Sequence, residues 1–308
     1  MSKASAPGKI ILFGEHAVVY GQPALAVPVT QVQADVRIDK IFSPGIRINA
    51  PNIQLNARLD SLASSHPLAA TVRNTLAALE VDSLPGVTVL IRSSIPVASG
   101  LGSGAAVSVA VIRALARYLE KDLTDEQVSA LAFETEKLYH GTPSGIDNTV
   151  VTYAKPVYFV KGQPIEILRV KKPFTILIAD TGIPASTKES VRDVRVQHHK
   201  KPERFETLFA AIGSIARTAR QLIESGMPES IGPLMDENHA LLRSMKVSSP
   251  ELDHLVDTAR KAGALGAKMS GGGRGGNMIA LVQPKKAGTV AKSLKEAGAT
   301  NTIITKVE

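Results

Sequence analysis

The chain has 308 residues, which is enough for two domains because single hydrophobic cores seldom grow beyond roughly 250–300 residues. Hydrophobic residues make up 44% and charged residues 21%, as in ordinary globular proteins, and the lack of cysteine excludes disulfides, thiolate metal sites and a cysteine nucleophile. The net charge of +8 favours anionic ligands. The densest basic stretch, 192–204, has no interleaved aromatic residues to stack bases, so we expect no nucleic-acid partner.

The first predicted strand covers residues 6–14, APGKIILFG, and leads into Glu15 and His16. Lys9 within this apolar strand is either an edge residue that reaches solvent or a charge directed at a site. Glu15 and His16 lie between apolar runs, and an unpaired buried carboxylate is costly, so they either face a ligand site or occupy a surface turn. The segment is interrupted by charged residues and resembles neither a signal peptide nor a membrane span, and we expect a cytoplasmic protein with no membrane partner.

A glycine-rich loop dominates the middle of the first half. Residues 30–38 alternate polar and apolar side chains, as in a half-exposed strand, and a polar stretch to about residue 65 and a helix over 68–79 follow. A strand at 87–92 then enters SSIPVASGLGSGAA, residues 93–106, which opens into a helix ending near residue 120. A strand, a glycine loop and a helix N-terminus together favour binding of an anion such as phosphate. The alternative is a tight turn that needs only small residues.

Two carboxylates follow on a helix and a turn. Thr124 and Gln127 form a capping box, which predicts a helix from residue 125 to about 140. Glu136 lies near its C-terminal end, where the helix dipole disfavours negative charge, so it either serves a cation or is a solvated side chain. Pro143 and Gly145 predict a sharp turn that presents Asp147, for catalysis or to cap the next helix.

The second half is predicted to be an α+β unit. Its expected strands are 156–161, 165–170, 174–180, 277–282 and 301–306, and its expected helices are 203–225, 229–242, 250–262 and 285–297. The paired histidines 198 and 199 diverge on a helix and do not indicate a metal site. A second glycine run, 271–276, has dinucleotide-binding spacing but precedes a strand, so that interpretation fails.

Three motifs carry a family resemblance across nearly the whole chain. They are PGK followed by GEHAVVYG (residues 7–21), residues 96–106, and KMSGGGRGG (residues 268–276). Their order and spacing resemble the GHMP kinases, and the first motif with segment 140–148 resembles the mevalonate kinase family in particular. The resemblance implies a two-domain α+β fold, with an N-terminal α/β domain at 1–165 and a ferredoxin-like C-terminal domain at 166–308.

The resemblance also implies ATP-dependent phosphorylation of the 5-hydroxyl of (R)-mevalonate in isoprenoid biosynthesis. Asp147 would orient the proton of that hydroxyl, and Lys9 would sit close by and lower the pKa of this carboxyl. Glu15, His16 and Thr187 would line the mevalonate pocket. The nucleotide-phosphate loop would comprise Ser93, Ala98, Ser99, Gly100, Leu101, Gly102, Ser103 and Gly104. Glu136 and Ser103 would bind Mg²⁺, and the family usually forms homodimers.

Two positions depart from the family pattern. Relatives commonly have a second serine, which helps to bind Mg²⁺, where this chain has Gly104. Arg274 interrupts the usual glycine run of the third motif, where it would either reach a phosphate or point to solvent. Two alternatives remain open: another GHMP kinase, acting on phosphomevalonate, homoserine or the 3-hydroxyl of mevalonate, and, because of these departures, a non-catalytic ligand sensor.

Overall fold

The computed structural model describes residues 1–82, 84–96, 99–140, 143–184 and 186–308. The chain forms two compact units, each built from separate segments. The first unit comprises Met1–Gly8, Val29–Pro96 and Gly102–Ala154. The second unit comprises Lys9–Pro28, Lys155–Glu308 and, within the glycine loop, the described residues 99–101. Two strands, β1 (Ser2–Phe13) and β2 (Ala24–Lys40), belong to both units, and a domain boundary after residue 165 stays a prediction.

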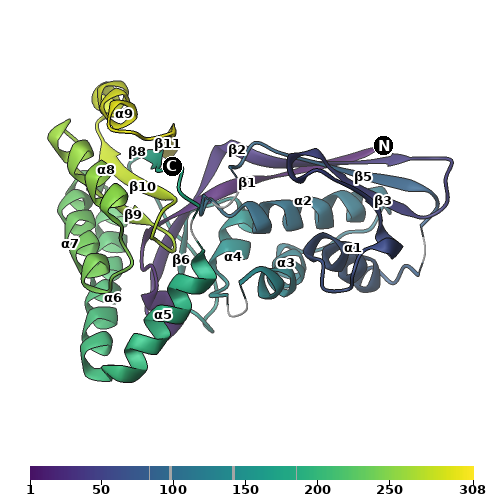
Figure 1. Cartoon of the computed structure of the whole chain (residues 1–308), viewed down its shortest axis with the longest axis horizontal. Helices are drawn as coiled ribbons and strands as arrows, with labels where there is room; N and C mark the ends of the chain where they lie inside the picture. Colours follow the sequence, from purple (N-terminus) through teal and green to yellow (C-terminus); the bar gives the residue numbers. More distant parts are fainter. Residues whose placement is uncertain (83, 97–98, 141–142, 185) are drawn as a thin grey trace. The chain divides into compact units, whose positions relative to one another are not determined.

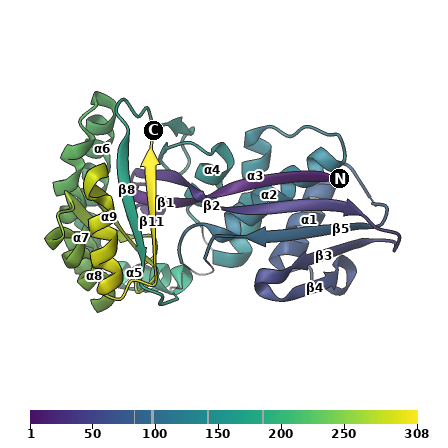
Figure 2. The same ribbon diagram turned by 90° about the horizontal axis from the view of Figure 1, so that it is seen from above.

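A sheet with one helical face forms the first unit. Its strands follow the order β4 (Leu55–Arg58), β3 (Ile46–Ala50), β5 (Val87–Ser93) and β2, and β1 also pairs with β2. Only β3 and β5 run parallel among the pairings whose register is known in this unit. Along β2, side chains from Val32 to Ile38 alternate between buried and exposed, as predicted, because successive side chains point to opposite faces. Figure 2 shows these strands side by side.

Four α-helices complete the described part of the first unit, and Figure 1 shows α1, α2 and α3 together along its sheet. The four are α1 (Pro67–Ala78), α2 (Ser103–Tyr118), α3 (Asp125–His140) and α4 (Ile146–Tyr153). The predicted capping box starts α3: the Thr124 N–H donates to Gln127 Oε1 at 2.9 Å, and the Gln127 N–H donates to Thr124 Oγ1 at 3.3 Å. The α2 helix buries Val109, Ile112 and Leu115, so its N-terminus is anchored by a deep apolar face.

The second unit contains a four-stranded antiparallel sheet with the order β11, β8, β10, β9. These strands are β8 (Phe174–Asp180), β9 (Gly266–Ser270), β10 (Asn277–Val282) and β11 (Asn301–Val307). Helices lie between β8 and β9 and between β10 and β11, which gives the β-α-β-β-α-β order of a ferredoxin-like domain, as expected. Two short strands, β6 (Val157–Phe159) and β7 (Glu166–Ile167), extend from the start of β2.

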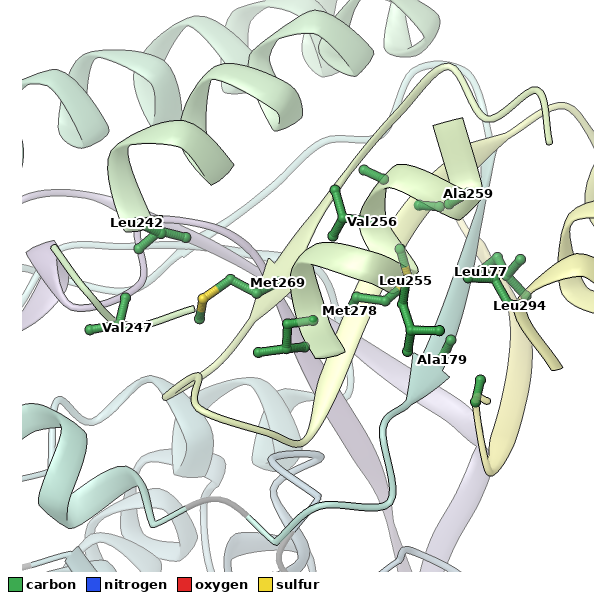
Figure 3. Packing of buried hydrophobic residues seen from close by; sticks show 14 of the residues in the cluster. Leu177, Ala179, Leu242, Val247, Leu255, Val256, Ala259, Met269, Met278 and Leu294 are labelled. Carbon is green, nitrogen blue, oxygen red and sulfur yellow. The ribbon is translucent and has the colours of Figure 1, made fainter. Parts of the chain in front are cut away.

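Among the described residues of the second unit, five α-helices accompany this sheet. They are α5 (Thr187–Lys200), α6 (Pro202–Ser225), α7 (Ile231–Ser244), α8 (Pro250–Lys261) and α9 (Ala287–Glu296). Figure 3 shows the hydrophobic core between this sheet and its helices, in which Met269 and Met278 of the sheet lie close to Leu255 and Val256 of α8. Because β10 is buried along its whole length, the glycine run that precedes it is attached to a rigid strand.

Two short strands and two α-helices lie outside the ranges expected from the sequence. The polar stretch after β2 contains the short strands β3 and β4, because Ile46, Ile48 and Ala50 alternate inward against β5. The predicted turn at Asp147 continues into α4, and a separate helix, α5, precedes α6. Within the described part of the chain, no helix is long and apolar enough to cross a membrane.

Candidate functional site

The glycine loop begins at Ser93, the last residue of β5. Asn52 holds this residue through two hydrogen bonds of 3.0 Å, one to its carbonyl oxygen and one from its N–H. The Ser93 hydroxyl accepts a hydrogen bond from the Ile95 N–H at 3.1 Å, which turns the chain at the strand end. Ala98 lies outside the described residues.

The loop ends at the N-terminus of α2, in the first unit. Gly102 is the residue before the helix and has a φ of 73°, which favours glycine, and Ser103 and Gly104 form the start of the first turn. Since Gly102 has no side chain to cap the helix, the first N–H groups of this 16-residue helix remain available to an anion. The phosphate site expected from the sequence stays a prediction for this helix N-terminus.

Residues 99–101 of the loop belong to the second unit and are tied to two of its strands. The Lys9 N–H donates to the Leu101 carbonyl oxygen at 2.9 Å, and Asn277 Nδ2 donates to the Ser99 carbonyl oxygen at 2.5 Å. The Gly100 backbone, with a φ of 83°, adopts a conformation that favours glycine. Lys9 is only 3% exposed, so its side chain does not extend into solvent, and the alternative of a charge directed at a site remains.

Glu136 lies in the last turn of α3 and is 2% exposed. A Cβ atom placed on Gly104 would lie 3.1 Å from Glu136 Oε1 and 3.2 Å from two ring carbons of Tyr139. Glycine at this position therefore gives the carboxylate and the ring room to approach the first turn of α2. Burial, with the negative charge of Glu136, raises the pKa of Tyr139 to about 12, so the phenol stays neutral.

The donor set in the first unit fits Mg²⁺ only in part. A carboxylate oxygen and a serine hydroxyl, from Glu136 and Ser103, are oxygen ligands of the kind that Mg²⁺ prefers. Among the described residues, no group of three histidine, aspartate or glutamate side chains is arranged to hold a metal. An ion bound here would need further oxygen ligands, and a nucleotide's phosphates are the usual source of such ligands.

Asp147 is the second residue of α4, and Gly145, with a φ of 96°, precedes that helix. The Ile146 N–H donates to the Ser144 hydroxyl at 3.3 Å, which fixes the turn before the helix. Gly145, and not Asp147, therefore occupies the capping position. Asp147 is partly exposed and lies in the first turn of α4, at the N-terminal end of that helix.

The residue pair Glu15 and His16 is buried in the second unit. Lys268 of β9 donates a hydrogen bond to Glu15 Oε1, and both side chains are fully buried. Burial raises the pKa of Glu15 and lowers the pKa of Lys268, while their mutual attraction opposes both changes. The pair joins the first motif to the third, which sequence reasoning missed.

His16 contacts the backbone of the third motif. Its Nε2 lies 3.0 Å from the Gly272 carbonyl oxygen, and burial lowers its pKa to about 4. Because a carbonyl oxygen only accepts, Nε2 carries the proton, and Nδ1 of the neutral ring is left as an acceptor. That buried Nδ1 has no hydrogen-bond partner among the described residues, so it is available to a ligand hydroxyl.

Thr187, the first residue of α5, packs against Gly272. A Cβ on Gly272 would lie 2.9 Å from Thr187 Oγ1, so only glycine permits this approach. Arg274, two residues further along, has a φ of 62° and donates to Asp193 of α5 at 2.6 Å. Arg274 therefore pairs with α5, a contact that the sequence did not indicate. His16 and Thr187 therefore both lie close to Gly272.

The expected site residues divide between the two units. The first unit contains Ser93, Gly102, Ser103, Gly104, Glu136 and Asp147. The second contains Lys9, Glu15, His16, Ser99, Gly100, Leu101 and Thr187. Sequence reasoning missed the supporting residues Lys268, Asn277 and Asp193; a charged Lys268 inside an apolar strand was the one local signal.

Two family models match the chain. The model described as GHMP kinases N terminal domain matches residues 68–155, and the model described as GHMP kinases C terminal matches residues 219–300. A protein named mevalonate kinase from Thermococcus sibiricus is 39% identical over 99% of this chain and 95% of its own length. Another of that name from Pyrococcus abyssi is 38% identical over 96% of this chain and 93% of its own length.

Solved structures with the same architecture agree with these matches. A mevalonate kinase from L. major in complex with R-mevalonate superposes with a TM-score of 0.86 and 32% identity, covering 100% of this chain and 96% of the other. A phosphomevalonate kinase from Streptococcus pneumoniae has a TM-score of 0.84 at 18% identity, over 99% of this chain and 100% of the other. At that identity the second likeness concerns the fold alone.

Proposed function

Because the chain belongs to the mevalonate kinase family of the GHMP kinases, we propose that it transfers the γ-phosphoryl group of ATP to the 5-hydroxyl of (R)-mevalonate. The product would be 5-phosphomevalonate, an intermediate of isoprenoid biosynthesis. The observation that carries the proposal is the 39% identity over 99% of the chain to a relative named mevalonate kinase. The retained Lys9, Glu136 and Asp147 supply the charged groups that such a transfer needs.

Asp147 and Lys9 are proposed to act on the reacting groups. Asp147, at the start of α4, would accept or orient the proton of the attacking hydroxyl, since phosphoryl transfer depends mainly on positioning the nucleophile. Lys9, on β1, would stabilise the negative charge on the transferring phosphoryl oxygens. We assign Lys9 an electrostatic role because its amine sits in a largely water-excluded environment, where charges interact strongly.

The nucleotide phosphates are proposed to bind the described loop residues and the N-terminus of α2. The residues involved are Ser93, Ser99, Gly100, Leu101, Gly102, Ser103 and Gly104. Glu136 and Ser103 would hold Mg²⁺, and the ion would neutralise phosphate charge when bound. The exposed backbone N–H groups of α2 would share that task.

His16 and Thr187, which both lie close to Gly272, are proposed to contact mevalonate. The neutral His16 ring offers its Nδ1 as an acceptor for a substrate hydroxyl. We propose that Glu15 acts through its buried pair with Lys268, which supports the backbone of His16.

The proposal is tested by a coupled assay with ATP, Mg²⁺ and a substrate panel. The panel comprises mevalonate, phosphomevalonate and homoserine, and ³¹P NMR identifies which hydroxyl of mevalonate is phosphorylated. We expect preferential turnover of mevalonate at the 5-hydroxyl. Asp147→Asn should reduce kcat by at least about 10²-fold and leave ATP binding nearly unchanged, and the exposed Asp122→Asn serves as its control.

Two alternatives predict other results in the same experiment. Preferential turnover of another alcohol, or phosphorylation of the 3-hydroxyl, would assign the chain to a different GHMP kinase activity. Tight ATP binding without turnover of any alcohol would favour a non-catalytic ligand sensor, the interpretation motivated by Gly104 and Arg274. Mg²⁺ titration of Glu136→Gln, with the exposed Glu134→Gln as control, tests the proposed metal role.

We further propose a homodimer that works in the cytoplasm, in keeping with the family resemblance. Light scattering coupled to size-exclusion chromatography tests the first part, since a dimer of this 32.6 kDa chain would have a mass of about 65 kDa, twice that of the chain. Fractionation of the source cells tests the second part.

A further inference from the structure

Four buried segments of the second unit are joined by a closed series of hydrogen bonds. The Asn277 side chain donates to the Ser99 carbonyl oxygen at 2.5 Å. Two residues along the loop, the Leu101 carbonyl oxygen accepts from the Lys9 N–H at 2.9 Å. Two residues along β1, Ile11 exchanges two hydrogen bonds with the Ser270 hydroxyl, at 2.8 and 3.2 Å.

The series closes through the β9–β10 hairpin, where Ser270 and Asn277 are directly opposite each other. These two residues flank the glycine run of the third motif and are 6% and 2% exposed. Their side chains therefore hold the loop and the strand that carries Lys9 at a fixed distance from one rigid hairpin. Buried hydrogen bonds of this kind are costly to leave unmade, because the lone acceptor loses its contact with water.

Asn277 is well suited to this task for a chemical reason. The Ser99 carbonyl oxygen needs a donor, and the asparagine amide provides one without charge. An aspartate has nearly the same shape but, as a carboxylate, would face the carbonyl with a second acceptor. The identity of the side chain, rather than its size alone, therefore decides whether residues 99–101 are held.

We propose that Asn277, together with Ser270, is a positioning residue that fixes residues 99–101 and Lys9 for binding of the nucleotide phosphates. This inference rests on the proposed function, in which the loop binds ATP. Asn277 acts through its hydrogen bond to the Ser99 carbonyl oxygen and not through contact with the nucleotide. Its loss should therefore weaken nucleotide binding more than mevalonate binding.

The test measures binding of a non-hydrolysable ATP analogue by calorimetry, with steady-state kinetics for both substrates. Asn277→Asp should weaken analogue binding and raise the ATP KM by about tenfold, within the range expected for one unmet buried acceptor. The KM for mevalonate should change by less than about twofold, because this hydrogen bond does not reach the His16 and Thr187 contacts. Asn277→Ala and Ser270→Ala should show the same direction, and the double variant Ser270→Ala/Asn277→Asp should lose less than the sum of the single effects.

Asp236→Asn is the matched control. Asp236 Oδ1 accepts from the Ala267 N–H at 2.9 Å and from Arg260 at 2.7 Å, at the other end of β9. This variant should lower the melting temperature by a similar amount and leave analogue affinity unchanged. If Asn277→Asp and Asp236→Asn both lose analogue affinity in proportion to their loss of stability, the inference is overturned.

Two further outcomes are distinguishable. If the wild-type chain binds the analogue and phosphorylates mevalonate while Asn277→Asp binds equally well, the inference fails and the proposed function stands. If the wild-type chain binds no nucleotide, both fail.

Discussion

Arg274 donates a hydrogen bond to Asp193 at 2.6 Å and thereby joins the third glycine motif to helix α5. Arg274 adopts a φ of 62°, a conformation that a glycine would adopt without strain. The hydrogen bond from Arg274 lowers the pKa of Asp193, so the carboxylate is charged at neutral pH. Asp193 and Thr187 both belong to α5, so the ion pair helps to position Thr187, the residue proposed to contact the substrate.

Replacing Arg274 by glycine should separate positioning from stability. Arg274→Gly removes the strained side chain as well as the ion pair, so we expect an unchanged or slightly higher melting temperature. The KM for mevalonate should rise by about two- to fivefold, the scale of an exposed ion pair, with an unchanged KM for ATP. Steady-state kinetics in low and high salt measure both effects, since the wild-type KM for mevalonate should depend more strongly on salt than that of the variant.

Asp193→Asn should have the same effect as Arg274→Gly, and the two together should add nothing further. Lys172→Met, which removes another exposed pair of the second unit, Lys172 with Glu229 at 2.6 Å, is the control and should leave both KM values unchanged. An unaltered mevalonate KM in Arg274→Gly would show that α5 is held by other contacts.

The buried pair of Glu15 and Lys268 predicts strong non-additivity in stability. Lys268→Met leaves the Glu15 carboxylate buried without its cation, so we expect a loss of about 3–5 kcal/mol in the free energy of unfolding. Glu15→Leu should cost a similar amount, while the double variant should recover most of the loss because no lone charge remains. Urea unfolding followed by circular dichroism measures all four proteins; purely additive losses would contradict the pairing.

Local sequence signals predicted the regular elements well. The capping box at Thr124 predicted α3, which runs from residue 125 to residue 140 as expected, because both partners of that motif lie within one turn. Helix α5 was missed because it is polar almost all round and buries only Ser190 and Val194, so it has little apolar periodicity. The strands β3 and β4 have only five and four residues, too few for a clear alternating pattern.

The supporting contacts of the site were less predictable. Lys268 and Glu15 are 253 residues apart, and Asn277 and Ser99 are 178 apart. No local periodicity links such residues, because tertiary packing alone brings them together. The motifs identified the side chains proposed to meet ligands, whereas the partners that position them became visible only in the structure.

Two buried histidines predict a stability that falls with acid. Burial lowers the pKa of both His16 and His239 to about 4, whereas a histidine in the unfolded chain titrates near 6.5. Below pH 6.5 the unfolded chain therefore binds more protons, so the free energy of unfolding should fall between about pH 6.5 and pH 4. The slope should be up to roughly 1.4 kcal/mol per pH unit for each histidine.

Variants isolate the contribution of one ring. The neutral His239 accepts a hydrogen bond from the Met269 N–H at its Nδ1 and donates from its Nε2 to Asp253. His239→Gln should reduce the pH slope of the free energy of unfolding by the contribution of about one proton. The exposed His254→Gln should leave this slope unchanged. Urea unfolding at pH 7.5, 6 and 5 gives the slopes; equal slopes for wild type and His239→Gln would contradict the assignment.

Gly104 predicts a steric effect on the proposed metal ligand. Gly104→Ala would place a methyl group 3.1 Å from Glu136 Oε1 and 3.2 Å from the Tyr139 ring, so these groups must shift by a few tenths of an ångström. A shift of this size should lower kcat/KM by about tenfold, less than the roughly 100-fold cost of a 1 Å displacement, and raise the Mg²⁺ concentration needed for half-maximal activity.

The double variant Gly104→Ala/Tyr139→Ala should recover part of the loss, because it frees space on the ring side. Gly288→Ala is the control, since no atom lies within 4 Å of the added methyl group. An unchanged Mg²⁺ dependence in Gly104→Ala would contradict the proposal that Glu136 binds the metal.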